Sequence, residues 1–430
     1  MNRSFYVTLL TGLVIRLVLA PITGHPYDLG LLGSEQRLYY QYGILDLTYF
    51  PTLPLIYYVQ LLFYAPYDFL RLLGVPDVQF FYHTTFMLET LFLKLPLIAC
   101  DVGIFYMLVK FTKKTHSGAL FFLNPFPIFV SSVWGTYDSL MLAPLILGVW
   151  FVGRNSAVSS ILFVVSGVAK LFGFLPYACM VFASLVQRKL RELLLEIIGG
   201  VAIVASIFIP SFILGGFRAF VYGIIYRFVG LGGVTSGSAG IGFQSPWNLF
   251  EAVLRVNPSA ILPIIPITVA IVSVGYSYQS SRKSSLTKPV LLSRWTLIGA
   301  IALSFLSASE PQWLSWLIPL GILYGATTGR VGLQYFSYVF GVVMTFLVMT
   351  LLQASGYLLL GSFDLIGFTE GLRNSGLFYA LMSTVMLLMF CGYVFVGRLK
   401  HFRFEILPFI LLIYFQIFFW LEIAGIGINF

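Results

Sequence analysis

The sequence predicts an all-α, polytopic transmembrane helical protein, and three observations predict this fold class. Of its 430 residues, 59% are hydrophobic and only 10% are charged, whereas soluble domains carry about 25% charged residues. Apolar runs of about 18 residues or more recur from end to end, and each is long enough to cross a hydrocarbon core of roughly 30 Å. These runs are continuous and not alternating, so we expect bilayer-spanning helices and not a closed barrel.

The first expected element is a retained span over residues 5–23. Arg3 precedes this apolar run, as in a signal peptide, but Arg16 interrupts it and no A-x-A-like cleavage site follows. Further spans are expected at 117–133, 139–152, 156–170, 171–186, 193–214, 259–277, 295–309, 311–326, 331–353, 377–397 and 404–421. The stretch 51–110 must contain an odd number of crossings, although its length suits about two. Either one segment lies along the interface or three short segments cross, and the total is about 13 spans, give or take two.

Lys and Arg gather in short loops, which the positive-inside rule assigns to the cytoplasm. These residues are Lys110, Lys113 and Lys114; Arg188, Lys189 and Arg191; Arg282, Lys283, Lys288 and Arg294; and Arg398, Lys400 and Arg403. Alternating spans then leave acids on the outer side, namely Asp28, Glu35, Asp138, Glu251, Glu310, Asp364 and Glu370. The rule uses only Lys and Arg, so this collection of acids is a separate observation that favours a functional outer surface.

Net charge, cysteine content and the lack of repeats narrow the expected partners and domain organisation of this membrane protein. The net charge of +9 is explained by topology and by contact with anionic lipid heads, so no nucleic acid is expected as a partner. The three cysteines, Cys100, Cys179 and Cys391, lie in apolar stretches without metal-like spacing. We find no fixed-period repeat, so residues 1–430 are interpreted as a single transmembrane domain. Within it, about 1–215 would be the catalytic part and about 216–430 a lipid- or acceptor-side part.

The first outer loop contains the first candidate for chemistry. Asp28 follows the first span, and Glu35 lies seven residues further on in a polar, aromatic-rich segment. A carboxylate at the membrane surface suits a general base. The alternative is an ordinary solvated loop with a helix-starting Asp.

Charges also occur inside the next apolar run. Glu89 is followed by Lys94 and Asp101, and the last two lie seven residues apart, which is two helical turns on one face. Intramembrane charges are costly and are usually paired or functional. A structural ion pair between helices is the favoured interpretation.

Three further segments deliver polar residues to the outer side. Asn124-Pro125 precedes a Trp-Gly bend that ends at Asp138, where an aromatic anchor with a helix cap is the alternative. Lys170 lies on the outer side against the positive-inside trend, so it either snorkels to the interface or meets a phosphate. Glu310 and Gln312 accompany two tryptophans in a sharp bend, for which aromatic anchoring is again the alternative.

Taken in order, these segments resemble the GT-C superfamily of membrane glycosyltransferases over residues 1 to about 320. Asp28 matches the first-loop catalytic acid, and Glu89 with Lys94-Leu95-Pro96 and Asp101 resembles the segment before the next spans of dolichyl-phosphate-sugar-dependent members. Asn124-Pro125 with Trp134-Gly135-Thr136-Tyr137-Asp138 resembles the NP…WGQxD pattern of GPI-type mannosyltransferase relatives, with Thr136 in place of Gln. Gln312-Trp313-Leu314-Ser315-Trp316 with Pro319 resembles the QYFxWY…P stretch of the first GPI mannosyltransferase. The paired DxD of that enzyme is not matched, since Asp28 stands without the second Asp.

The resemblance implies transfer of a hexose, with mannose expected, from a polyprenyl- or dolichyl-phosphate donor. The acceptor would be a glycan, lipid or protein on the outer or lumenal face. Asp28 would be the general base of an inverting displacement and Lys170 the partner of the donor phosphate. Glu35, Asp138, Glu310 and Gln312 would bind substrate. No cofactor is required, although Asp28 and Asp138 could share a divalent ion. The enzyme would be a multi-pass protein of the plasma membrane in a prokaryote or of the endoplasmic reticulum in a eukaryote.

Two other classes stay open. A transporter or lipid flippase also shows polar residues and Gly/Pro breaks in its spans, and a non-catalytic scaffold is a third class. An enzyme needs Asp28 and Asp138 around one outer cavity, whereas a transporter needs its polar groups near the bilayer midplane.

Overall fold

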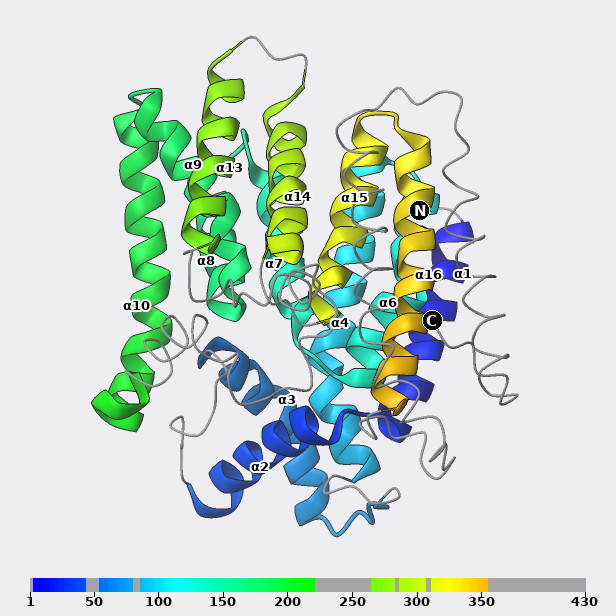
Figure 1. Ribbon diagram of the computed structural model, residues 1–430. Helices are drawn as coiled ribbons and strands as arrows, with labels where there is room; N and C mark the ends of the chain where they lie inside the picture. The colour runs from blue at the N-terminus through cyan, green and yellow to red at the C-terminus, as the bar shows by residue number, and fades with distance from the viewer. Residues whose placement is uncertain are drawn as a thin grey trace, which may run out of the picture.

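The computed structural model describes residues 3–43, 54–79, 86–220, 264–282, 286–306 and 311–354, and their regular structure is helical. Most of the helices lie side by side and run roughly along the height of the molecule, each covering part of it or most of it (Figure 1). These helices are α1 (Arg3–Leu19), α4 (Met87–Thr112), α5 (Thr115–Phe122), α7 (Asp138–Phe151), α8 (Ser156–Ala169), α9 (Phe174–Val186), α10 (Leu190–Phe220), α13 (Ile264–Ser281), α14 (Lys288–Leu306), α15 (Leu317–Thr327) and α16 (Val331–Ala354).

Several described helices have the length and hydropathy of membrane spans. Arg3–Ile22, Met87–Thr112 and Leu190–Pro210 meet both criteria singly, and Thr115–Phe122 with Pro125–Trp134 meets them as a bent pair. The protein is therefore an integral, multi-pass membrane protein, as predicted. The total of about 13 spans stays a prediction, because the expected spans 377–397 and 404–421 lie outside the described residues.

The span expected at 117–133 is not continuous. Helix α5 ends at Phe122, and the chain resumes as α6 (Pro125–Ile128) and the π-helix η2 (Phe129–Trp134), with an angle of 49° at the break. Pro125 has no N–H to continue the first helix. The Asn124 side chain instead accepts a hydrogen bond from the Phe126 N–H at 3.0 Å and starts the second helix.

Within the described part of the stretch 51–110, one helix qualifies as a membrane span. Helix α4 meets the length and hydropathy criteria, whereas α3 (Pro54–Leu72) does not. Helices α2 (Pro26–Tyr42) and α3 lie across the lower ends of the other helices (Figure 1). Of the two alternatives left by the sequence, the described residues favour the one in which a segment lies along the interface.

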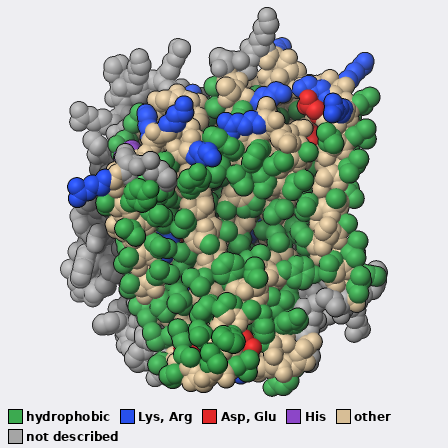
Figure 2. Space-filling model, turned by 180° about the vertical axis from the view of Figure 1, so that it is seen from behind, with side chains coloured by type: hydrophobic (Ala, Val, Ile, Leu, Met, Phe, Trp, Pro, Cys, Tyr) green, Lys and Arg blue, Asp and Glu red, His purple; other side chains and the backbone are tan. Residues whose placement is uncertain are grey.

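Charge separates along the height of the molecule. Lys and Arg follow the ends of α4, α9 and α13 and start α14, and all these helix ends lie at the top of Figure 1. Figure 2 shows Lys and Arg gathered along that edge, above a wide band of hydrophobic side chains. We call these two ends the basic end and the acidic end, since Asp28, Asp77, Glu89 and Asp138 lie at the opposite helix ends.

Two apolar clusters hold the helices together. The larger one joins α4 to α9 and α13 to α16 around side chains such as Phe105, Phe126, Leu145 and Leu317, which are fully buried. The smaller one, which includes Leu29, Tyr64 and Leu93, fixes α2 and α3 on the start of α4. This second cluster sets α2, and therefore Asp28, against the bundle at the acidic end.

Candidate active site at the acidic end

Asp28 lies in the first turn of α2, where the chain leaves the first span. His25 caps this helix, because its Nδ1 accepts a hydrogen bond from the Asp28 N–H at 3.3 Å, and Pro26 begins the first turn. Asp28 Oδ2 accepts a 2.7 Å hydrogen bond from the Trp134 indole N–H and lies 3.1 Å from His25 Nδ1. Among the described residues nothing donates to Oδ1, and the side chain is 31% exposed. One carboxylate oxygen is thus held while the other is accessible.

The bend 134–138 carries the partner of Asp28. The π-helix η2 ends at Gly135, whose φ of +92° favours glycine. A Cβ at this position would lie 2.9 Å from Leu29 Cδ2 and 3.1 Å from Lys94 Cε, so the bend packs closely against α2 and α4. π-helical turns inside longer helices are frequent at functional sites. Here η2 sets the Trp134 indole opposite Asp28.

Asp138 begins α7 at the end of the same bend and is only 1% exposed. Its Oδ1 accepts hydrogen bonds from Lys170 Nζ at 2.7 Å and from the Trp316 indole N–H at 2.5 Å. Its Oδ2 accepts one from the Thr136 hydroxyl at 2.9 Å. This carboxylate is buried, paired with a cation and accepts three hydrogen bonds, so it is less accessible than that of Asp28.

Lys170 lies between α8 and η3 (Leu171–Gly173), where the chain turns back at the acidic end. Its ammonium is 5.5 Å from the Tyr137 ring, 5.3 Å from the Trp316 ring and 5.9 Å from the Trp313 ring. Cation–π attraction to three rings adds to the Asp138 ion pair. The Lys170 side chain is still 12% exposed, so its charge is accessible from the site.

The structure brings two of the predicted acids to one bend. Trp134 donates to Asp28 and Thr136 donates to Asp138, so residues 134–138 join α2 to α7. Gln312 is 7% exposed in η7 (Pro311–Trp316), the segment whose Trp316 reaches Asp138. Glu310 lies outside the described residues, and its predicted role stays a prediction.

Glu35 is buried, with 2% exposure, in α2. It lies two helical turns after Asp28 on the same face, about 10 Å along the axis. The Tyr57 hydroxyl of α3 is close enough to interact electrostatically with the Glu35 carboxylate. Glu35 therefore belongs to the α2–α3 contact, and substrate reaches it only if the site extends along α2.

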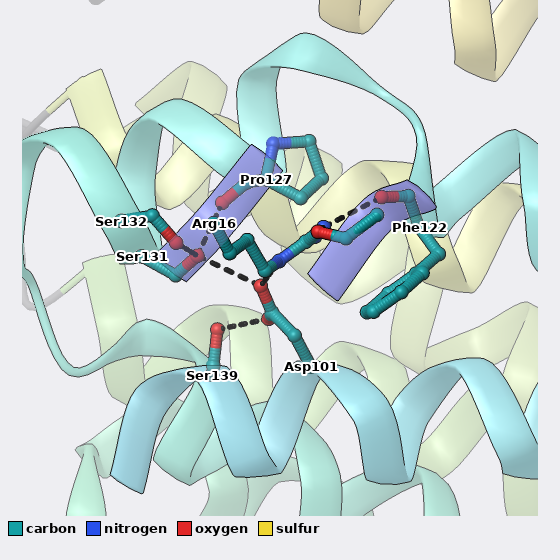
Figure 3. Close-up of polar contacts among 8 residues, drawn as sticks. Arg16, Asp101, Phe122, Pro127, Ser131, Ser132 and Ser139 are labelled. Atoms are coloured by element: carbon teal, nitrogen blue, oxygen red, sulfur yellow. Dashed lines mark hydrogen bonds and ion pairs between the residues drawn. The ribbon is translucent and has the colours of Figure 1, made fainter. Parts of the chain in front are cut away.

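Asp101 forms an ion pair between helices, and its partner is Arg16. Arg16 Nε lies 2.9 Å from Asp101 Oδ2, and both side chains are fully buried. Asp101 also accepts hydrogen bonds from Ser131 at 2.7 Å and from Ser139 at 2.6 Å (Figure 3). The cluster therefore connects α1, α4, η2 and the start of α7, one residue from Asp138.

Lys94 binds backbone oxygens in place of a carboxylate. Its ammonium lies 3.0 Å from the Ala20 carbonyl, 2.8 Å from that of Ser132 and 3.0 Å from that of Val133, and it also reaches Thr23. These carbonyls end the first span and η2. Lys94 thus ties together the two segments that lead to Asp28 and Trp134.

Glu89 has a structural position at the start of α4. It accepts a 2.7 Å hydrogen bond from the Tyr64 hydroxyl and lies 3.2 Å from Arg37 Nε. Asp77 accepts the N–H groups of Leu88 and Glu89 at 2.9 and 3.2 Å. These contacts fix α2, α3 and α4 to one another below the site.

No three His, Cys, Asp or Glu side chains gather as metal ligands within the described ranges. A divalent ion shared by Asp28 and Asp138 would need further ligands from the substrate or from water. That site stays a prediction.

The sequence did not predict the partners of the two acids. It left Trp134 and Trp316 open between a functional segment and an interfacial anchor and gave His25 no role, yet all three contact the two acids. The pairing of Arg16 with Asp101 had a signal, because both charges interrupt apolar runs and have opposite sign. The indole partners had none, since they depend on how distant helices pack.

Comparison with solved structures finds a similarity of shape. No protein family and no curated protein sequence matches the chain. A crystal structure of ArnT from Cupriavidus metallidurans bound to undecaprenyl phosphate is similar, with a TM-score of 0.47 and 16% sequence identity. The similarity covers 91% of this chain and 77% of that one. With this TM-score and this sequence identity, the similarity supports no conclusion about function.

Proposed function

We propose that this protein is a GT-C-like membrane glycosyltransferase that takes a hexose from a polyprenyl-phosphate donor at its acidic end. One observation carries the proposal: Asp28 presents an accessible carboxylate oxygen beside the bend that also positions Asp138 and Lys170. A base and a cation at the same membrane surface are the two groups that the reaction needs. The sequence resemblance adds the substrate class, with mannose as the expected sugar.

The reaction is a single displacement with inversion. Asp28 takes the proton of an acceptor hydroxyl as that oxygen bonds to the anomeric carbon. The bond from this carbon to the phosphate oxygen breaks, and the polyprenyl phosphate leaves with one more negative charge. Lys170 has three N–H donors and gives one to Asp138 in this structure. The others are available for the leaving phosphate, whose developing charge they would stabilise.

An apolar groove supports a lipid-linked donor. It has a volume of about 510 Å³ and runs between α8, α9 and α10, lined by residues such as Val164, Phe174, Tyr177, Val204 and Phe208. One lining residue, Phe174, begins α9 four residues after Lys170 in the chain, beyond the turn η3. In the proposal the isoprenoid tail occupies this groove and the phosphate lies at its end.

The structure supports a transporter function less well than a transferase function. The charges within the spans, Arg16, Lys94 and Asp101, are fully buried and bound to protein groups. A transport path needs polar groups that water or substrate can reach near the midplane. The accessible charges of the described site lie at the acidic end instead.

The experiment is transfer from a labelled polyprenyl-phosphate hexose by the purified protein, with slow release of the sugar to water as a second readout. Asp28→Asn should still bind the donor and lose about 10²–10⁴-fold in transfer, because only the proton acceptor is lost. Asp68→Asn is the matched control, since Asp68 pairs with Arg71 on α3 and should keep normal transfer. Near-normal transfer by Asp28→Asn would remove it as the base, and no transfer or release by the wild type with any donor would sink the proposal.

A further inference from the structure

A second, polar pocket lies at the basic end, at the opposite end of the molecule from Asp28. It has a volume of about 200 Å³ and is enclosed by the ends of α7 to α10 and by parts of α13 and α14. Its charged lining residues are Arg154, Lys189, Glu192, Glu196 and Lys288. The proposed transfer reaction uses none of these groups.

Glu196 is the buried group of this pocket. The residue is 1% exposed, and its Oε1 accepts a 3.1 Å hydrogen bond from the Ser184 hydroxyl. Its Oε2 is buried and receives no hydrogen bond from the described residues. A buried carboxylate oxygen without a donor is costly. Since Glu196 lines a cavity, a donor on a ligand would satisfy it.

The mouth of the pocket carries positive charge. Lys288 is close enough to Lys189, Glu192 and Glu196 to interact with their charges. Lys189 Nζ lies 3.5 Å from Glu192 Oε2, so this carboxylate balances part of its charge. Two neighbouring ammonium groups repel each other unless an anion lies between them. A phosphate would bring them together, because each ammonium has three N–H donors.

The surroundings favour a lipid as the source of that phosphate. Leu185, Val186, Leu190 and Leu194 adjoin the pocket residues in sequence and are between 52% and 66% exposed. Arg154 stacks on Trp150 at 3.7 Å, which is typical of a membrane–water boundary. Acyl chains could therefore lie on apolar surface directly beside a pocket that fits a headgroup.

We propose that this pocket binds a phospholipid headgroup of the leaflet at the basic end. Lys189 and Lys288 hold the phosphate, and Glu196 accepts a hydrogen bond from an ammonium or hydroxyl group of the headgroup. The proposal is independent of the reaction at the acidic end. It discriminates between two similar lipids: phosphatidylethanolamine has N–H donors for Glu196, whereas the trimethylammonium of phosphatidylcholine has none.

The test is lipid retention by the full chain, measured by native mass spectrometry after release from nanodiscs with equal amounts of the two lipids. The wild type should retain phosphatidylethanolamine over phosphatidylcholine by roughly tenfold, as expected for one charge-assisted hydrogen bond. Glu196→Gln should remove this preference and keep the Ser184 bond, since Gln retains an acceptor oxygen. Lys189→Ala/Lys288→Ala should lower the retention of both lipids.

One control and two further arms complete the experiment. Lys110→Ala, at the same end but outside the pocket, should behave as the wild type. Thermal midpoints separate loss of the site from loss of the fold, and Lys288 is exposed, so its substitution alone should fold. Displacement of the lipid by soluble phosphoethanolamine would assign the same site to a free phosphate ester, whereas lipid retained against it would assign the site to the membrane. Equal retention of both lipids by the wild type, or an unchanged preference in Glu196→Gln, would overturn the proposal.

Discussion

At the scale of single residues, the two acids of the site differ in what their neighbours leave available. Asp138 accepts three hydrogen bonds and is 1% exposed, while Asp28 has one oxygen held by Trp134 and one accessible. A base must receive a proton, and a buried carboxylate that already accepts three hydrogen bonds does so less readily. Under the proposed function, this difference favours Asp28 as the base and an orienting role, toward Lys170, for Asp138.

The Trp134 indole N–H is expected to orient the base. Trp134→Phe keeps an aromatic ring in the bend but removes the 2.7 Å hydrogen bond to Asp28 Oδ2. A hydrogen bond to a charged group contributes about 1.5–3 kcal/mol, so we expect transfer to fall about tenfold or more while donor affinity changes little. The measurement is a donor titration that separates kcat from KM. Trp150→Phe at the basic end is the control, and unchanged turnover in Trp134→Phe would show that the bond has no part in orientation.

Lys170 and Asp138 should respond differently to substitution, although they form one ion pair. Lys170→Ala should weaken donor binding as well as turnover, because the donor and the leaving group both carry phosphate charge. Asp138→Asn releases Lys170 and retains an acceptor for Trp316, so donor affinity should be kept. Equilibrium binding of the labelled donor measures both.

Stability must be controlled in this comparison. Lys170→Ala leaves the Asp138 carboxylate buried without its cation, which is destabilising. The combined variant Lys170→Ala/Asp138→Asn should recover thermal stability and still bind donor weakly. Tight donor binding by Lys170→Ala would exclude Lys170 as the phosphate partner.

The residue types of the site could be predicted from sequence, but their contacts could not. Asp28, Asp138 and Lys170 are polar groups at the ends of apolar runs, and such groups stand out by their cost in a membrane. The tryptophans do not stand out, because interfacial tryptophans are common in any membrane protein. Whether an indole N–H meets lipid headgroups or a carboxylate depends on packing across more than 100 residues of sequence, as for Trp134 and Asp28.

At the scale of elements, the site depends on a broken span. Helix α5 stops before Pro125, and the following α6 and η2 turn by 49° toward the acidic end. Hydropathy predicted one continuous span here, since hydropathy is insensitive to direction. The proline was visible in the sequence, but the π-helix was not. Its Ser131 hydroxyl donates to Asp101 and its Ser132 carbonyl accepts from Lys94, and these contacts between distant segments cannot be read from sequence.

The Arg16–Asp101 pair is expected to fix these elements to α1 and α4. Arg16→Met or Asp101→Asn alone leaves one buried charge without its partner, and breaking such a pair costs about 3–5 kcal/mol. The double variant Arg16→Met/Asp101→Asn should be less destabilised than the sum of the two single changes. Thermal unfolding in detergent measures the cycle. The reference is the pair of Arg71 and Asp68 on one helix, whose side chains are 41% and 11% exposed, so a weaker coupling than in the fully buried pair is expected. Additive effects in the buried pair would show that it does not couple the helices.

At the scale of the whole molecule, the separation of charge is the feature that the sequence predicted best. The cations described at the acidic end are neutralised locally: Arg37 lies beside Glu89, Arg71 beside Asp68 and Lys170 beside Asp138, while Lys94 binds carbonyls. The positive-inside rule counts only Lys and Arg, so these few cations are exceptions to the bias. Each of them has local partners in the structure, which lowers the cost of placing it at the acidic end.

This arrangement predicts that the acidic end faces the outer or lumenal compartment. Cysteine labelling tests this topology, and the sequence favours Ser285 and Gln312 as the labelled positions. Gln312, however, is only 7% exposed and would label poorly. Val78, which is 62% exposed between α3 and α4, is a better position at the acidic end, and the exposed Ser281 at the end of α13 is its counterpart at the basic end. In a background with Cys100, Cys179 and Cys391 replaced by Ser, a membrane-impermeant maleimide added to intact cells or sealed right-side-out vesicles should label Val78→Cys and not Ser281→Cys. Permeabilisation should then allow both to react, which shows that the second cysteine is accessible. Labelling of both positions before permeabilisation, or of Ser281→Cys alone, would contradict the topology, and Asp28 could then not act on an outer acceptor.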